Sequence, residues 1–120
     1  MIEPKYPELE QIAAQLWRTL TPIIADLDGY PLITVPAGFE TDGASVPRLF
    51  WPICPKFSNY TNAAVVHDYL YFHRAVPGHF DEYDRADADR IFLELMRELG
   101  VSRWQRWAMY SAVRMFGPRW

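Results

Sequence analysis

The first apolar pattern in the chain runs from Glu8 to Leu20. Its hydrophobic residues recur at intervals of three or four, the spacing of one helix face: Leu9, Ile12, Ala13, Leu16, Trp17 and Leu20. This pattern predicts an amphipathic helix over 8–20. Thr19 and Thr21 weaken the end of that helix, so a strand starting near Trp17 is the alternative interpretation.

The next segment has the pattern of a small β-hairpin. Two short apolar runs, Pro22–Asp26 and Tyr30–Val35, flank the dipeptide Asp28-Gly29. Asp-Gly between two such runs is a strong signal for a tight turn, because glycine accepts the backbone conformation that the turn requires. We therefore expect two antiparallel strands here.

The second half of the chain predicts three helices. An apolar helix around Ala63–Tyr71 should extend to about Arg74, before a segment containing Pro-Gly. A second helix is expected from Arg85 to Leu99, with Gly100 as its C-terminal cap. Its apolar stripe consists of Ala88, Ile91, Phe92, Leu95, Met96 and Leu99. A last helix is expected over Arg103–Phe116.

The length and composition fit one folded domain covering residues 1–120. Half of the 120 residues are hydrophobic and 16% are aromatic, which argues against disorder. We predict an α+β domain that is mainly helical. An N-terminal helix and a small β-hairpin would precede two long antiparallel helices and a C-terminal helix.

Charge and cysteine content exclude several classes of protein. The net charge of −3 and a pI near 5.5 argue against a general nucleic-acid binder. No apolar run approaches the ~20 residues of a transmembrane span. The N-terminus lacks the basic-then-apolar order of a signal peptide. Cys54 is the sole cysteine, so an internal disulfide is excluded.

The candidate chemistry centres on His67 and Asp68, which interrupt the apolar helix. Charged side chains in such surroundings need a partner, a hydrogen bond or a metal. Adjacent helix positions point about 100° apart, so the two side chains serve different faces. Tyr71 lies one turn after His67 on the same face. Asp89 falls near the apolar stripe of the second helix, and we expect His67 to be its partner if the helices pack antiparallel.

A long loop rich in glycine and proline, Ala37–Phe57, contains a second candidate site at Asp42 and Gly43. A tight turn at Asp-Gly aims backbone carbonyls and one carboxylate at a point, and hard cations such as Ca²⁺ prefer that mixture of ligands. An ordinary turn without a ligand fits the same dipeptide. Both interpretations remain open.

The predicted C-terminal helix combines aromatic residues with arginines, including Trp104, Trp107, Arg103 and Arg106. Such a helix can make peripheral contact with a membrane surface or bind a partner protein. More often, such a helix covers a core and presents its arginines to water.

Taken together, these motifs resemble the DUF1353 family, a domain of unknown function found in phages and bacteria. The resemblance covers most of the chain and is carried by Val35–Pro47, His67–Tyr71, Arg85, Ala88, Asp89, Phe92, Met109, Tyr110, Phe116 and Gly117. It implies a phage or prophage origin and hence a location in the host cytoplasm or the virion. It implies no settled activity.

A second, local resemblance, over Thr41–Leu99, is to prokaryotic phospholipase A2. The matching pieces are Thr41-Asp42-Gly43-Ala44-Ser45 with Pro47, then Ala63–Tyr71 with its His-Asp pair, then Asp89-Arg90-Ile91-Phe92. The resemblance implies a calcium-assisted hydrolase of a lipid or another ester.

That resemblance also implies a role for each matching residue. His67 would be the general base, and Asp89, with Tyr71 bonded to it, would orient the imidazole. Asp68, Asp42 and Gly43 would hold Ca²⁺. The hydrolase interpretation requires these groups to converge in one solvent-accessible cleft.

The chain departs from the phospholipase pattern in its cysteines, because Ala44 and Ala64 occupy their places. One alternative is therefore that His67, Asp68, Tyr71 and Asp89 form a structural polar network. Another is a phage structural or accessory protein, in the virion or tail, that docks on other phage proteins without catalysis.

Overall fold

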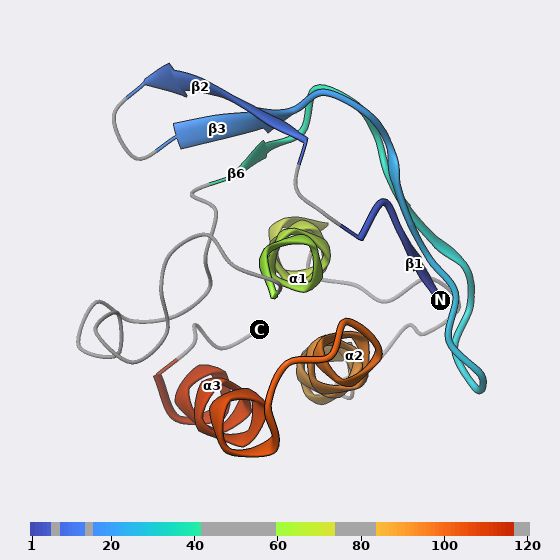
Figure 1. The fold of residues 1–120 in the computed structure, drawn as a ribbon, viewed down its shortest axis with the longest axis vertical. Coiled ribbons are helices and arrows are strands. Elements are labelled where there is room, and N and C mark those ends of the chain that lie inside the picture. The colour runs from blue at the N-terminus through green and yellow to red at the C-terminus, as the bar shows by residue number, and fades with distance from the viewer. Residues whose placement is uncertain (6–7, 14–15, 42–59, 74–83, 117–120) are drawn as a thin grey trace.

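The computed structural model describes residues 1–5, 8–13, 16–41, 60–73 and 84–116, and within these it contains six strands and three helices. The strands are β1 (Ile2–Glu3), β2 (Leu9–Ala13), β3 (Leu16–Thr19), β4 (Ile23–Ala25), β5 (Ile33–Val35) and β6 (Glu40–Thr41). The helices are α1 (Thr61–His73), α2 (Asp84–Glu98) and α3 (Arg103–Phe116). Figure 1 shows the strands arching around one side of α1, with α2 and α3 on the other.

The strands form two antiparallel sheets of three strands each, in the orders β1-β4-β5 and β2-β3-β6. Because β3 runs on into β4, and β5 into β6, the two sheets share one long bent hairpin. The outer half of the hairpin, next to its tip at Asp28-Gly29, consists of β4 and β5 and pairs Ile23 with Val35. The inner half, further from the tip, consists of β3 and β6 and pairs Trp17 with Thr41. The bend lets the hairpin cover α1 from two directions (Figure 1).

Thr19 fixes the corner of the bent hairpin. Its backbone N–H donates to the Phe39 carbonyl (2.9 Å), and its carbonyl accepts from the Gly38 N–H (2.8 Å). Its hydroxyl donates to the Pro36 carbonyl and accepts from the Phe39 N–H, at 2.9 and 3.0 Å. Gly38 has a φ of 88°, a value that side chains with a Cβ rarely adopt. The corner therefore depends on both residues.

The prediction of a mainly helical fold is wrong, and so is the predicted helix over 8–20. That segment contains β2 and β3, which pair with Leu9 opposite Thr19 and Gln11 opposite Trp17. A register shift between Gln11 and Ala13 interrupts the alternation of side chains in β2. Because of this irregularity, Leu9 and Ile12 are both partly buried although they are three residues apart in the sequence. The apolar residues of this strand therefore have the spacing expected of a helix. The alternative strand near Trp17 is confirmed as β3.

The small hairpin predicted around Asp28-Gly29 is confirmed, although it is only the outer half of a larger structure. β4 and β5 pair in register, and Gly29 has a φ of 86°, which the turn requires. Ile23, Ala25, Ile33 and Val35 point into the core, while Ile24 and Thr34 are exposed. This alternation is that of a sheet with one buried face.

The three helices lie close to their predicted positions. α2 ends in a Schellman motif, in which the Gly100 N–H donates to the Arg97 carbonyl and the Val101 N–H to the Met96 carbonyl. Gly100 takes the required left-handed conformation, with a φ of 79°. The predicted C-terminal cap is thus confirmed.

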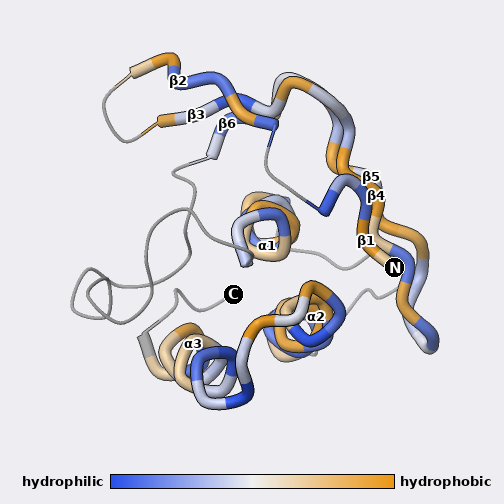
Figure 2. Tube along the Cα trace, in the orientation of Figure 1, coloured by the Kyte–Doolittle hydropathy of each residue, from blue (hydrophilic) through white to orange (hydrophobic). Residues whose placement is uncertain are grey.

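Helix α1 forms the centre of the core. Every residue from Thr61 to His67 is buried, so this helix contacts protein on all its faces. It packs against β4, β5 and β6 on one side and α2 on the other. Figure 2 shows α1 between the β4–β5 pair and α2, with hydrophobic residues in each of these elements. A polar residue within α1 is therefore placed between elements that come from both halves of the chain.

Candidate functional site

His67 and Asp89 form a buried pair, as the sequence predicted. The His67 Nε2 lies 2.6 Å from Asp89 Oδ1, and neither side chain has any exposed surface. His67 comes from the middle of α1 and Asp89 from the first half of α2. A carboxylate in the apolar stripe of a helix is stable only with such a partner.

The ring contacts show that α1 and α2 run antiparallel at this point. His67 stacks on Phe92, with ring centroids 4.7 Å apart. Tyr71, one turn further along α1, instead reaches back to Asp89, almost one turn earlier on α2. Phe92 thus supports one face of the imidazole while Tyr71 packs near it, at a centroid distance of 4.2 Å. The orientation of the ring is fixed by packing as well as by the hydrogen bond.

Two further groups hold the carboxylate of Asp89. The Tyr71 hydroxyl donates to Oδ1, the oxygen that also faces His67. The Arg114 guanidinium on α3 donates to Oδ2 through Nη1 at 2.9 Å. One buried carboxylate therefore links α1, α2 and α3.

Arg114 is the residue of this site that sequence reasoning missed. Its helix carries several arginines among aromatic residues, a pattern that fits a surface in water. The expectation that the helix covers a core is confirmed, since Met109, Ala112 and Val113 are buried. Arg114 nevertheless pairs with Asp89, and its side chain is 36% exposed. The available signal was the buried carboxylate itself, because a carboxylate in low dielectric favours a cation beside it.

Burial alone would raise the pKa of Asp89, but its partners reverse that effect. Hydrogen bonds from His67 and Tyr71, the charge of His67 and the hydrogen bond from Arg114 hold the pKa of Asp89 below its ordinary value. Asp89 is therefore an anion at neutral pH and accepts hydrogen bonds only. His67 Nε2 therefore carries a proton in either charge state of the ring, and Nδ1 is the nitrogen whose protonation decides that charge.

Asp68 faces away from this pair, as expected for the next position of the helix. Its Oδ2 accepts a hydrogen bond from the Thr41 hydroxyl at 2.7 Å, at the end of β6. Asp42 and Gly43, the other predicted metal ligands, follow Thr41 directly in the chain but lie outside the described residues. Within the described ranges, no three His, Cys, Asp or Glu side chains gather as metal ligands. The structure thus brings the start of the predicted cation loop to Asp68.

Comparison with known sequences places this arrangement in a family. A family model described as a protein of unknown function (DUF1353) matches residues 17–113. The chain belongs to the DUF1353 family. The match begins within β3 and includes His67, Asp68, Tyr71 and Asp89, but it ends one residue before Arg114.

Two curated proteins of Sinorhizobium fredii (strain NBRC 101917 / NGR234) are similar to this DUF1353 chain. The uncharacterized protein y4jT is 40% identical over 88 residues, covering 72% of this chain and 24% of the relative. The uncharacterized protein y4iH is 33% identical over 85 residues, covering 68% of this chain and 32% of the relative. The matched region thus spans about a quarter to a third of these relatives. No solved structure matches the chain.

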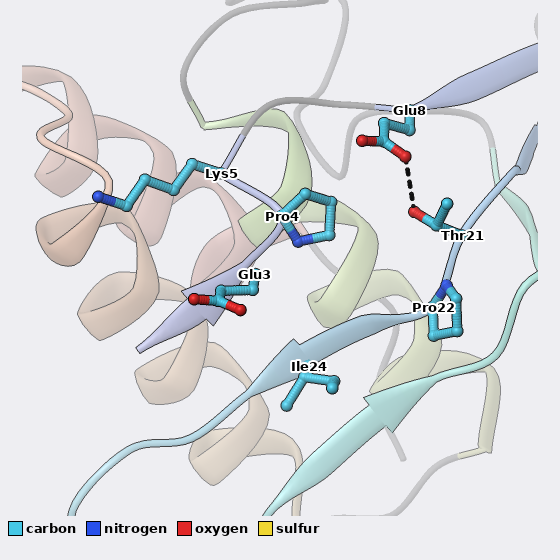
Figure 3. A pocket seen from close by; sticks show the side chains of 7 residues that line it. All are labelled: Glu3, Pro4, Lys5, Glu8, Thr21, Pro22 and Ile24. Carbon is cyan, nitrogen blue, oxygen red and sulfur yellow. Dashed lines mark hydrogen bonds between the residues drawn. The ribbon is translucent and has the colours of Figure 1, made fainter.

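A separate hollow in this DUF1353 domain lies at the ends of β1 and β4, and Figure 3 shows the side chains around it. It has a volume of about 500 Å³ and is lined by Glu3, Pro4, Lys5, Glu8, Thr21, Pro22 and Ile24. The Thr21 hydroxyl donates to Glu8 Oε2 at 2.9 Å across one side. Neither His67 nor Asp89 contributes to this hollow, so it is distinct from the buried pair.

Among the described residues of this DUF1353 domain, no helix is both long enough and apolar enough to cross a membrane.

Proposed function

We propose that this DUF1353 domain hydrolyses esters, with His67 as the general base. The observation that supports this most is the orientation of the imidazole. Because Nε2 is held by the anionic Asp89, proton transfer falls to Nδ1. An imidazole whose second nitrogen is fixed by a carboxylate is the arrangement that activates water or a hydroxyl in hydrolases.

The other residues of the network have positioning roles in this proposal. Asp89 keeps the imidazole in one tautomer and favours the imidazolium that forms when Nδ1 accepts a proton from water. Tyr71 and Arg114 hold the two oxygens of Asp89, and Phe92 holds the plane of the ring. The local resemblance to prokaryotic phospholipase A2 makes a lipid ester the substrate class that we propose.

Asp68, Asp42 and Gly43 are the residues that would hold Ca²⁺ in this proposal. The fit of Asp68 is supported by its contact with Thr41, because that contact brings a carboxylate to the start of a loop that carries a second one. Oxygen donors of this kind suit a hard cation. When bound, Ca²⁺ would supply a Lewis acid for an ester carbonyl.

The burial of the pair favours a second candidate function, a non-catalytic scaffold. The imidazole of His67 is completely buried, so the solvent-accessible cleft that the hydrolase requires is not open in this structure, and water and an ester reach the ring only if neighbouring residues move. A network that links three helices through one carboxylate is also what a structural role requires. In this candidate the domain is a phage structural or accessory protein and would be recovered with purified virions.

The substitution His67→Gln separates the two candidates. The Gln amide can still donate to Asp89, but it has no basic nitrogen. A hydrolase should cleave a p-nitrophenyl ester or phosphatidylcholine micelles and lose this activity in His67→Gln while remaining folded. A scaffold should show no hydrolysis in either protein, and the loss of the buried imidazole should lower the thermal stability of His67→Gln.

A calcium titration tests the proposed metal site independently. We expect CaCl₂ to raise the Tm of the wild type and to have no effect in Asp68→Asn. Asp28→Asn is the matched control, because it removes an exposed carboxylate at the hairpin tip, where Asn-Gly forms the same turn. A Tm that does not respond to Ca²⁺ in the wild type would exclude the metal site.

A further inference from the structure

Helix α3 has an apolar face that points into solvent. The side chains of Trp104, Trp107 and Met115 are 61%, 45% and 72% exposed. At 100° per residue these positions fall on one side of the helix, together with the exposed Ser111. The opposite side of α3 supplies the buried Met109, Ala112 and Val113 to the core. A helix on a protein surface normally presents charged and polar residues to water. The two exposed tryptophans on this face therefore indicate a binding surface.

The charge of α3 is opposite to that of the whole chain. The helix contains Arg103, Arg106 and Arg114 and neither Asp nor Glu, while the chain has a net charge of −3. Arg114 is paired with Asp89, and Arg106 donates to the Val101 carbonyl but remains a cation. Arg103 is exposed in the first turn beside Trp104, where the positive end of the helix dipole adds to its charge. The ligand should therefore be anionic as well as apolar.

We propose that this face of α3 binds the surface of an anionic lipid bilayer. Tryptophan prefers the boundary between headgroups and acyl chains, and arginine beside it attracts anionic headgroups. A second copy of this chain fits less well, because two such faces would bring cationic helices together. A nucleic acid also fits less well, because Arg103 and Arg106 are too few for the usual set of phosphate contacts.

The position of α3 in the fold suits contact with a flat surface. In Figure 1 the helix lies at the edge of the molecule, and it packs mainly against α2, away from β1, β4 and β5. Its exposed face can therefore meet a bilayer without displacing the core. Binding requires no catalysis, so this inference stands or fails independently of the proposed hydrolysis.

Vesicle sedimentation tests the proposal. The wild type should sediment with vesicles of phosphatidylglycerol and phosphatidylcholine in equal parts, and much less with phosphatidylcholine alone. The double variant Trp104→Ser/Trp107→Ser and the variant Arg103→Glu should each bind about tenfold more weakly or worse, since each removes an interfacial anchor. Leu32→Ser is the matched control, because Leu32 is 59% exposed on the β side of the molecule. Thermal melts should show that all variants remain folded.

Several results would overturn the proposal. Wild-type protein that stays in the supernatant with the phosphatidylglycerol vesicles would do so, and so would unchanged binding in the double tryptophan variant. A dimer in analytical ultracentrifugation that dissociates in the double variant, without vesicle binding, would assign the face to a second copy. Binding to single-stranded DNA with no vesicle binding would assign it to a nucleic acid.

Discussion

Replacing Arg114 with methionine should weaken the domain through a carboxylate on another helix. Methionine keeps an unbranched apolar stem in contact with α2 but removes the hydrogen bond to Asp89 Oδ2. Asp89 has no exposed surface, so it cannot recover that hydrogen bond from water. The hydrogen bonds from His67 and Tyr71 remain, both on Oδ1.

The size of the effect follows from the burial of the two partners. Breaking a fully buried ion pair costs about 3–5 kcal/mol, and one hydrogen bond to a charged group contributes about 1.5–3 kcal/mol. Arg114 is 36% exposed and thus partly solvated, which reduces the interaction below the fully buried case. We expect Arg114→Met to lower the free energy of unfolding by about 2–3 kcal/mol at pH 7.

The pH dependence of this loss tests its cause. The pKa of Asp89 is lowered in the folded state despite the opposing effect of burial, so its ionised form contributes stability above about pH 4, the unfolded value. That contribution is lost as the pH falls through the folded-state pKa. Without Arg114 the folded-state pKa of Asp89 is higher than in the wild type, so the stability difference between the two proteins should shrink as the pH falls through these two folded-state pKa values.

Urea unfolding at pH 7 and at successively lower pH values, down to the acid-unfolding region, measures both quantities. Arg103→Met is the matched control, because Arg103 is exposed on the same helix, and its loss should change stability by less than about 0.5 kcal/mol. A loss at Arg114 below about 1 kcal/mol at pH 7, or one that does not shrink as the pH falls through the folded-state pKa of Asp89, would refute the assignment of Asp89 as an anion stabilised by Arg114.

Three further experiments test other parts of the structure. Gly100→Ala should cost about 1 kcal/mol in urea unfolding because of its φ of 79°, whereas Gly100→Asn should cost less; equal stability in all three proteins would contradict the left-handed cap. Tyr71→Phe should cost about 1–2 kcal/mol and should raise the pKa of Asp89, seen as an upward shift of the acid-unfolding midpoint. Thr41→Val should cost about 1 kcal/mol in wild-type background but almost nothing in Asp68→Ala, a double-mutant cycle that would return no coupling if the two side chains do not interact.

The helical part of the fold could be predicted because its signals are local. The apolar stripe of α2, its glycine cap and the turn at Asp28-Gly29 each depend on a few neighbouring residues. The contact between His67 and Asp89 could also be predicted, since a buried carboxylate and a buried imidazole on adjacent helices require each other. These are the features that the structure confirms.

Two features could not be predicted because they depend on distant parts of the chain. The irregularity in β2 shifts the pairing register with β3 between Gln11 and Ala13. The apolar residues of this segment therefore have the spacing of a helix, and the two strands could not be recognised from that spacing. The pairing of Arg114 with Asp89 depends on where α3 packs. Nothing in the sequence of α3 distinguishes this arginine from the exposed Arg103 at the other end of the helix. Both errors arise where tertiary contacts override a local pattern.

The shared hairpin determines where the chain tolerates a change of length. An extra residue at the Asp28-Gly29 tip would enlarge a surface turn and leave every strand pair in place. An extra residue between Thr19 and Ile23 should instead shift β3 relative to β6 while β4 stays paired with β5, and so disturb the contact between Thr41 and Asp68. The spacing between the corner and the two sheets therefore sets the position of the loop that begins after β6.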